Sequence, residues 1–259
     1  PSLVHITHDL VEAFHGATMV IIAVPSQSFR DNLCWVRDSI QGSPIILSAT
    51  KGLELGSAHR MSQLLLEELP ERFASQICAL SGPNLALEIV DNKPSSTVVA
   101  GRSPKSAKVA QSILMSSNFR VYTNDDMIGV ELGGALKNIV ALGCGISDGL
   151  GYGDNAKSAF ITRGLAEITR LGVAAGANPL TFAGLAGLGD LVATCASSLS
   201  RNRLVGEKLA NGAPLQDILA SMENVAEGVY TTGAAIKLAK EFGVDMPIAQ
   251  ATHKVLFED

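Results

Sequence analysis

The chain has 259 residues, 47% of them hydrophobic, which suffices for a large core arranged as one big domain or two moderate ones. Its formal net charge is −5 and it has no basic run, which argues against a nucleic-acid partner because binding phosphates requires clustered lysines and arginines. The longest apolar runs, such as residues 19–24, are far shorter than the roughly 18 to 20 residues that cross a bilayer, so we expect a soluble protein without a membrane span.

The first half of the chain alternates short β-branched runs with segments of helical periodicity. Strands are predicted at 18–24, 44–49, 76–80, 97–100 and 119–122. Helices are predicted around them at 9–14, 29–40, 57–69, 83–90 and 104–115. This alternation is typical of βαβ units, so we expect an α/β fold with a mainly parallel sheet.

From residue 126 onward the pattern is helical, without a convincing strand. Helices are predicted at 126–146, 155–175, 179–185, 188–196, 200–210, 214–222, 227–242 and 247–257. We therefore predict an α/β domain over residues 1–124 and an all-helical domain over residues 125–259, packed against each other because no low-complexity linker separates them. In the second of these helices, the spacing of Arg163, Glu167 and Arg170 predicts a solvated face.

The cysteines and histidines give little support for a metal site, and we predict none. His5, His8 and His15 lie close together in the sequence, but we expect exposed histidines rather than ligands. No C-x-x-C pair occurs, and the cysteines are interpreted as small core residues in a reducing cytoplasm. They are widely spaced, at Cys34, Cys78, Cys144 and Cys195.

The stretch from Glu131 to Gly145 predicts a helix with very little side-chain bulk around one lysine. Its apolar residues recur at three- and four-residue spacing, so one side should face a core. Lys137 lies on a different side, beside Gly133, Gly134 and Ala141. Each glycine costs a helix interior roughly 1 kcal/mol relative to alanine, which indicates that backbone or a ligand approaches closely there. The alternative is a lysine that extends to solvent from a tightly packed helix.

No strand of this sequence is followed by the G-x-G-x-x-G turn that opens a dinucleotide-binding sheet. The nearest match, residues 151–156, lies between two helical segments. Either the fold binds no dinucleotide, or its first βαβ unit precedes this chain. Three predicted strands end in small or polar residues, at 23–26, 48–52 and 81–84. Each is alone an ordinary turn, but open α/β sheets bind ligands at this edge, so together they favour a ligand-binding rim.

The helical half carries two polar clusters of interest. Asp190 follows the glycine-rich turn at residues 184–189. Ser200 is predicted to cap a helix whose first turn carries Arg201 and Asn202, a geometry suited to holding a phosphate. Simpler interpretations stay open, with Asp190 as a helix cap and Arg201 as an exposed surface arginine.

Seven motifs, taken in order, resemble those of the bacterial NAD(P)-dependent glycerol-3-phosphate dehydrogenases: ATKGLE (49–54), SGPN (81–84), FRVYTNDDMIGVELGGALKN (119–138), ITRGLAEITRLG (161–172), GLAGLGDLVATC (184–195), SRNR (200–203) and EG (227–228). The resemblance covers nearly the whole chain. It implies a Rossmann-like, doubly wound, mainly parallel sheet followed by an all-helical domain. It also implies that the unit with G-x-G-x-x-G should precede Pro1, which leaves the N-terminal part of the sheet incomplete. Asn84 departs from the family, in which Ser or Thr is frequent.

The resemblance implies reversible hydride transfer between sn-glycerol 3-phosphate and NAD(P)+, giving dihydroxyacetone phosphate, in an enzyme that supplies glycerol 3-phosphate for phospholipid synthesis. Lys137 is then the expected acceptor of the C2 hydroxyl proton. Its pKa should fall from about 10.4 towards roughly 7 to 8, and both burial and the cation Lys51 act in that direction. Asp190 acts in the opposite direction, so we assign it to orienting Lys137 or the substrate.

The resemblance also implies a homodimer and two sets of binding residues, and the cysteines already favour a cytoplasmic protein. Within these sets, Arg201 and Asn202 are expected to hold the substrate phosphate. The substrate set comprises Lys51, Gly82, Asn84, Lys137, Asn138, Asp190, Thr194, Ser200, Arg201 and Asn202. The set for the cofactor, NAD or NADP, comprises Lys51, Ala86, Arg201, Val225 and Glu227.

Two other interpretations stay open at this point. The layout also resembles other dehydrogenases of the superfamily that act on hydroxy acids, such as the 6-phosphogluconate and hydroxyisobutyrate groups, although the SRNR and GLGD motifs argue against them. In a different class, the chain is a non-catalytic binding or dimerisation module on a degenerate nucleotide fold. The joint presence of Lys51, Lys137, Asp190 and Arg201 argues against this module.

Overall fold

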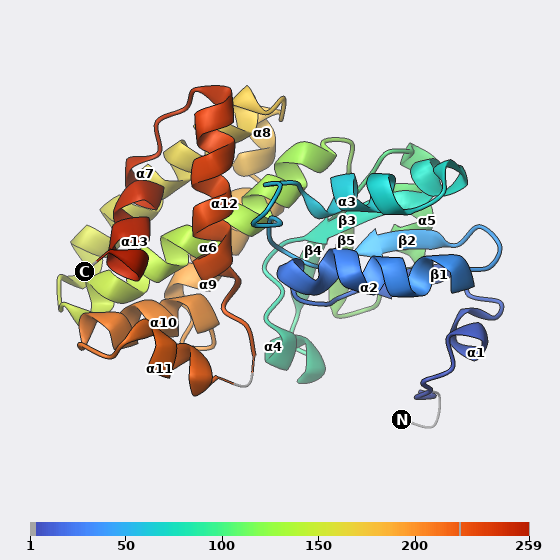
Figure 1. The fold of residues 1–259 in the computed structure, drawn as a ribbon, viewed down its shortest axis with the longest axis horizontal. Helices are drawn as coiled ribbons and strands as arrows, with labels where there is room; N and C mark the ends of the chain where they lie inside the picture. The colour runs from blue at the N-terminus through green and yellow to red at the C-terminus, as the bar shows by residue number, and fades with distance from the viewer. Residues whose placement is uncertain (1–3, 223, 259) are drawn as a thin grey trace.

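The computed structural model describes residues 4–222 and 224–258. Figure 1 shows a sheet with its own helices in one part of the molecule and a group of helices in the other. The five strands lie in the order of the chain: β1 (Met19–Ile22), β2 (Ile45–Ser48), β3 (Ile77–Ser81), β4 (Ser95–Gly101) and β5 (Phe119–Asn124). Only the β3–β4 pair of this sheet is antiparallel, so the predicted mainly parallel sheet is confirmed.

Helices cover both faces of the sheet, as a doubly wound fold requires. On one face, α2 (Phe29–Val36) and α3 (Met61–Glu68) pack on strand residues such as Ile46. On the other face, α5 (Pro104–Leu114) packs on strand residues such as Leu47. Ile46 and Leu47 point to opposite faces because successive side chains of a strand alternate.

The remaining helices lie close to their predicted positions. They are α1 (Leu10–Phe14), α4 (Ala86–Val90), α6 (Met127–Gly149), α7 (Gly153–Ala174), α8 (Pro179–Phe182), the π-helical turn η4 (Leu185–Gly189), α9 (Asp190–Ala196), α10 (Arg201–Ala210), α11 (Leu215–Ala220), α12 (Glu227–Phe242) and α13 (Pro247–Phe257). Short 3-10 turns occur at η1 (Ser26–Ser28), η2 (Arg37–Ser39) and η3 (Glu71–Gln76).

Two predicted helix starts were wrong. Helix α3 begins at Met61 rather than at residue 57, because Ala58 has a left-handed φ of 62° and a short bridge joins Leu53 to Arg60. Helix α4 begins at Ala86 rather than at residue 83, because the backbone of Leu85 before it is still extended.

Helix α6 is the central helix of the helical part, where it contacts α7, α9, α10 and α12 (Figure 1). Its length and hydropathy would suffice to cross a membrane, but 89% of its most apolar window is buried inside the protein. The segment Pro179–Ala196 passes the same length and composition test, with 44% of its window buried. The burial of α6 identifies it as a core helix.

The predicted environments of two side chains, Glu167 and Cys34, were also wrong. Glu167 does not lie on a solvated face of α7: it is buried and accepts hydrogen bonds from the backbone N–H groups of Ile248 and Ala249, at 2.9 Å each. The carboxylate thereby satisfies free donors at the start of α13. Cys34 is not a core residue but lies exposed beside Glu68, whereas the other three cysteines are buried as expected.

Candidate active site

The face of α6 that carries Gly133 and Gly134 has little side-chain bulk. It allows the helical half of the chain to pack closely against the end of the sheet. A Cβ atom on Gly133 would meet the carbonyl oxygen of Ala186, and one on Gly134 would meet the hydroxyl of Ser81. The same position on Gly134 lies 3.6 Å from Cδ of Lys51. Backbone and a second lysine therefore approach this face closely, as the paired glycines predicted.

One carboxylate joins two lysines beside this face. Oδ1 of Asp190 lies 2.7 Å from Nζ of Lys137, and Oδ2 of Asp190 lies 2.8 Å from Nζ of Lys51. Lys137 also donates to Oγ1 of Thr194, and Lys51 donates to the carbonyl oxygen of Gly82 at 2.7 Å. An ammonium group has three N–H donors, so each lysine keeps one donor for a ligand.

The surroundings of Lys137 lower its pKa from 10.5 to about 8. Burial is the largest cause because it penalises the charged form; the charge of Asp190 acts in the opposite direction, and the charge of Lys51 reinforces burial. Burial also opposes the charged form of Asp190, but Lys51 and Lys137 outweigh it and hold the pKa of that carboxyl below its ordinary value.

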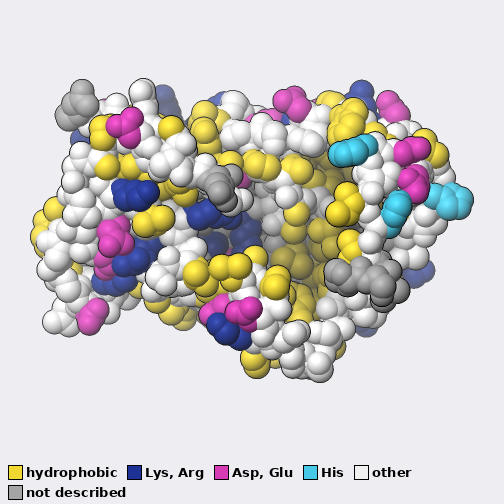
Figure 2. All heavy atoms as spheres, turned by 90° about the horizontal axis from the view of Figure 1, so that it is seen from below, with side chains coloured by type: hydrophobic (Ala, Val, Ile, Leu, Met, Phe, Trp, Pro, Cys, Tyr) yellow, Lys and Arg dark blue, Asp and Glu magenta, His cyan; other side chains and the backbone are white. Residues whose placement is uncertain are grey.

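Both lysines line a cavity of about 480 Å³ between the sheet and the helices. Strands β1, β2 and β3 run parallel, so their carboxyl ends meet at this edge of the sheet. Figure 2 shows Lys and Arg side chains in a hollow of the molecular surface. The cavity lining comprises Ala23, Val24, Pro25, Ala49, Thr50, Lys51, Asn84, Leu85, Lys137, Asn138, Thr194, Leu199, Ser200, Arg201, Asn202, Asn224, Val225 and Glu227.

The start of α10 forms the side of the cavity opposite the sheet. Ser200 caps the helix by accepting from the N–H of Arg203, and Arg201 extends to the carbonyl oxygen of Val225 at 2.8 Å. The amide of Asn202 donates to Oδ1 of Asn138 at 2.9 Å and accepts from a backbone N–H at the start of α12, also at 2.9 Å. Asn202 therefore ties α6, α10 and α12 together and keeps one amide hydrogen for a ligand.

Close helix packing fixes the position of α10. A Cβ atom on Gly206 would collide with the carbonyl oxygen of Leu142, and one on Gly145 would collide with that of Arg203. The backbones of α6 and α10 touch at these two glycines. This contact sets the position of Arg201 and Asn202 relative to Lys137.

A second carboxylate joins the two halves at the cavity rim. Glu227 accepts from the backbone N–H of Ser26 at 2.9 Å, and its other oxygen accepts from the Ser26 hydroxyl. Gly52 lies between them, because a Cβ atom there would meet both side chains.

The structure brings together most of the predicted site residues but not all of them. Gly82 and Asp190 lie behind the cavity wall, where Gly82 contacts Lys51 and Asp190 contacts both Lys51 and Lys137. Ala86 is an exposed residue of α4 outside the cavity lining. Among the lining residues that the sequence did not single out, Leu199 and Asn224 belong to loops without a motif. Within residues 4–222 and 224–258, no cluster of His, Cys, Asp or Glu could hold a metal ion.

The two halves of the chain match two models of one family. Residues 1–107 match the model described as NAD-dependent glycerol-3-phosphate dehydrogenase N-terminus, and residues 126–259 match its C-terminus. The chain is 53% identical over 259 residues to a glycerol-3-phosphate dehydrogenase [NAD(P)+] from Dehalococcoides mccartyi, covering all of this chain and 72% of that protein. It is 51% identical over 251 residues to the enzyme of the same name from Geobacillus thermodenitrificans, covering 96% and 73%.

Solved structures agree with this relationship. The crystal structure of glycerol-3-phosphate dehydrogenase from Coxiella burnetii superposes with a TM-score of 0.90 at 38% identity, covering 97% of this chain and 76% of that one. A D-mandelate dehydrogenase complex with NADH has a TM-score of 0.57 at 14% identity, over 92% of this chain and 77% of its own. This second likeness shows the fold alone.

Proposed function

The chain belongs to the NAD-dependent glycerol-3-phosphate dehydrogenase family, and we propose that Lys137 exchanges the substrate proton in the reaction of that family. The enzyme is an NAD(P)-dependent oxidoreductase that interconverts sn-glycerol 3-phosphate and dihydroxyacetone phosphate, a reaction of glycerophospholipid metabolism. The role of Lys137 is supported by its burial in the cavity wall, where it contacts Asp190 and Thr194 and keeps one N–H donor for a ligand.

We assign the nicotinamide end of NAD or NADP to this cavity. Residues Ala23 to Pro25, at the carboxyl end of β1, give it an apolar wall on the sheet side, which is where open α/β sheets bind dinucleotides. When bound, the cofactor supplies the hydride acceptor for oxidation and the hydride donor for reduction. Lys51, Val225, Glu227 and Arg201 lie on the same lining as this wall, which supports the proposed cofactor contacts. Ala86 has no such support.

The proton chemistry follows from the pKa of Lys137. As a neutral amine, Lys137 accepts the proton of the C2 hydroxyl when glycerol 3-phosphate is oxidised; as an ammonium, it returns the proton when the ketone is reduced. A pKa of about 8 lets both forms be populated near neutral pH. Asp190 and Thr194 hold the amine in place. The free N–H of Lys51 is available to the same substrate oxygen or its neighbour.

The substrate phosphate is assigned to the first turn of α10. Arg201 supplies a guanidinium, Asn202 supplies its free amide hydrogen, and the helix terminus adds a favourable dipole. Ser200 already caps this helix with its hydroxyl oxygen, so we assign it a contact through its O–H hydrogen. Asn84 faces the cavity from the sheet side, although Ser96 and Thr97 occupy its amide group in part.

Three further assignments complete the proposal. The division into an α/β domain over residues 1–124 and a helical domain over residues 125–259 is supported by the end of the last strand at Asn124. A homodimer and a cytoplasmic location are supported by the family resemblance. Analytical ultracentrifugation and cell fractionation test these two assignments.

The test of the proposed role compares the complete gene product with its Lys137→Ala variant. Oxidation of NADH and of NADPH is followed with dihydroxyacetone phosphate as the substrate, which also determines the preferred coenzyme. Lys137→Ala should lower kcat roughly 10²- to 10⁴-fold while the dissociation constant of the coenzyme stays near that of the unmodified enzyme. Turnover retained by Lys137→Ala would remove the proton-transfer role from this residue.

A further inference from the structure

The loop that carries Lys51 is shared by both halves of the molecule. The loop spans residues 51–60. Two of its residues, Leu53 and Ala58, are buried in the core cluster of the helical half. Ala58 has a left-handed φ of 62°, a strained conformation for a non-glycine residue that persists only where surrounding contacts enforce it. The position of Lys51 therefore depends on contacts that hold the loop from outside.

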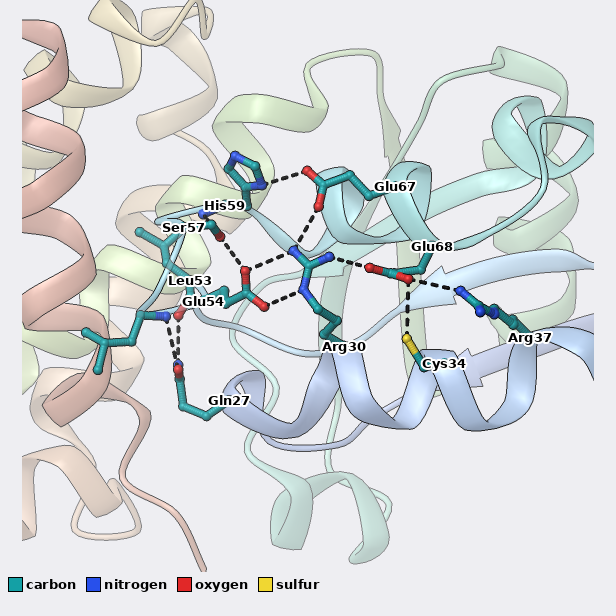
Figure 3. Close-up of polar contacts among 11 residues, drawn as sticks. Gln27, Arg30, Cys34, Arg37, Leu53, Glu54, Ser57, His59, Glu67 and Glu68 are labelled. Atoms are coloured by element: carbon teal, nitrogen blue, oxygen red, sulfur yellow. Dashed lines mark hydrogen bonds and ion pairs between the residues drawn. The ribbon is translucent and has the colours of Figure 1, made fainter.

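On the side of the sheet, one arginine supplies the main charged contact to this loop. Arg30 of α2 binds Glu54 in a bidentate pair, with Nε–Oε1 at 2.8 Å and Nη2–Oε2 at 3.0 Å (Figure 3). The same guanidinium pairs with Glu67 at 2.8 Å and with Glu68, both on α3. Arg30 thus connects α2, α3 and the loop through three carboxylates.

Gln27 adds uncharged contacts to the same loop. Its amide oxygen accepts from the N–H of Leu55 at 3.0 Å, and its amide nitrogen donates to the carbonyl oxygen of Leu53 at 2.8 Å (Figure 3). Gln27 therefore holds the backbone of residues 53 and 55, and Arg30 holds the side chain of Glu54 between them. Only Gly52 separates this segment from Lys51. Gln27 also donates to Ser26, so the contact reaches the cavity rim.

We propose that Arg30 is a positioning residue for the reaction, which holds Lys51 against Asp190 by fixing Glu54, three residues further along the same loop. This inference rests on the proposed role of Lys137. The bidentate geometry matters because a planar guanidinium fixes both the distance and the orientation of a carboxylate. Lys51 in turn neutralises one oxygen of Asp190 and repels the ammonium form of Lys137.

The proposal predicts a change in pH dependence rather than a mere loss of stability. The charged groups facing Lys137 are Asp190 and Lys51. The Cys195 thiol also faces it, but a hydrogen bond to Cys144 and burial raise the pKa of that thiol, so it stays neutral. If Lys51 moves away, the repulsion disappears and the full charge of Asp190 acts on Lys137, so the ammonium form gains stability. The acid limb of glycerol 3-phosphate oxidation should then move to higher pH.

Arg37 provides a matched control. It lies on the same surface and pairs with Glu68 at 3.1 Å, but it has no contact with residues 51–60 among the hydrogen bonds and ion pairs of the described chain. The hydrogen bonds and ion pairs of Arg30 hold the pKa of Glu54 and of Glu68 below their ordinary values, and those carboxylates stay charged in the control. His59 and Cys34 complete the charged and titratable groups of the cluster (Figure 3).

The experiment measures kcat/KM for glycerol 3-phosphate oxidation against pH in the complete gene product and four variants. Lys51→Met removes the second cation outright, so it serves as the reference for the other variants. It should move the acid limb upward by roughly one pH unit. Arg30→Gln and Glu54→Gln should move it in the same direction and lower kcat about 10-fold or more, while Arg37→Gln should leave it unchanged. Arg30→Gln and Glu54→Gln remove the same contact from its two sides, so the test stays decisive if one variant fails to fold.

A second readout does not depend on turnover. In protein labelled with ¹³C-lysine, the Cε signal of Lys137, assigned with Lys137→Arg, reports its titration directly and should show the same upward shifts. If Lys51→Met shifts this titration and neither Arg30→Gln nor Glu54→Gln does, the inference is wrong and the proposed function stands. If Lys51→Met shifts nothing, the coupling between the two lysines is absent and the inference fails with it.

Discussion

Asp190 holds Lys137 at 2.7 Å while its other oxygen binds a second lysine at 2.8 Å. The pair is almost fully buried, with side-chain exposures of 2% for Asp190 and 8% for Lys137. A buried amine between a carboxylate and a second cation experiences opposing charges, and its burial then decides the direction of its pKa shift.

The two directions of the reaction should depend on pH in opposite ways. Oxidation needs neutral Lys137, so its kcat should rise through a pKa of about 8, whereas reduction needs the ammonium form and should fall over the same range. Steady-state kinetics in both directions between pH 6 and about 10 measure the two limbs. Parallel rises in both directions would contradict the assignment.

Asp190→Asn should lower the free energy of unfolding and should also shift the pH profile of oxidation. The substitution leaves two lysines without their shared carboxylate, which typically costs about 3 to 5 kcal/mol in the free energy of unfolding. It also removes the charge that favours the ammonium form of Lys137, so the acid limb of oxidation should move to lower pH. Urea unfolding and the pH profile test the two effects separately, and a limb that moves upward would be inconsistent with this geometry.

Arg201→Ala should raise KM for the phosphorylated substrate by roughly 10- to 100-fold, because it removes one charge-assisted hydrogen bond from the assigned phosphate site. Its effect on kcat should be small, since the proton and hydride are exchanged at the other end of the substrate. Arg163→Ala, on α7 and outside the cavity lining, is the control. Equal KM values in the two variants would place the phosphate elsewhere.

Gly206→Ala should destabilise the protein by roughly 1 to 3 kcal/mol, the usual cost of overpacking. The added Cβ would push α10 away from Leu142 on α6 and disturb the contact between Asn202 and Asn138. Thermal unfolding measures the loss. Gly56→Ala is the matched control because the space around Gly56 is open, and a comparable loss in both variants would refute the packing explanation.

Local patterns sufficed for the elements and for most residues of the cavity. Alternating apolar runs predicted all five strands, and the paired glycines beside Lys137 predicted the close approach of backbone on α6. The exceptions have a common cause. Glu167 has the spacing of a solvated residue but is buried by α13, and Arg30 carries no motif although it binds three carboxylates. Periodicity reports which side of an element is apolar, not which distant segment covers it.

The sequence by itself determined the order of the elements, the central glycine-lined helix and the family, since each depends on residue types at fixed spacing. Tertiary structure alone decided that Asp190 bridges Lys51 and Lys137 and that Glu227 binds Ser26. These contacts join residues far apart in the chain, and their strength depends on burial and charge. Both of those are properties of the packed molecule.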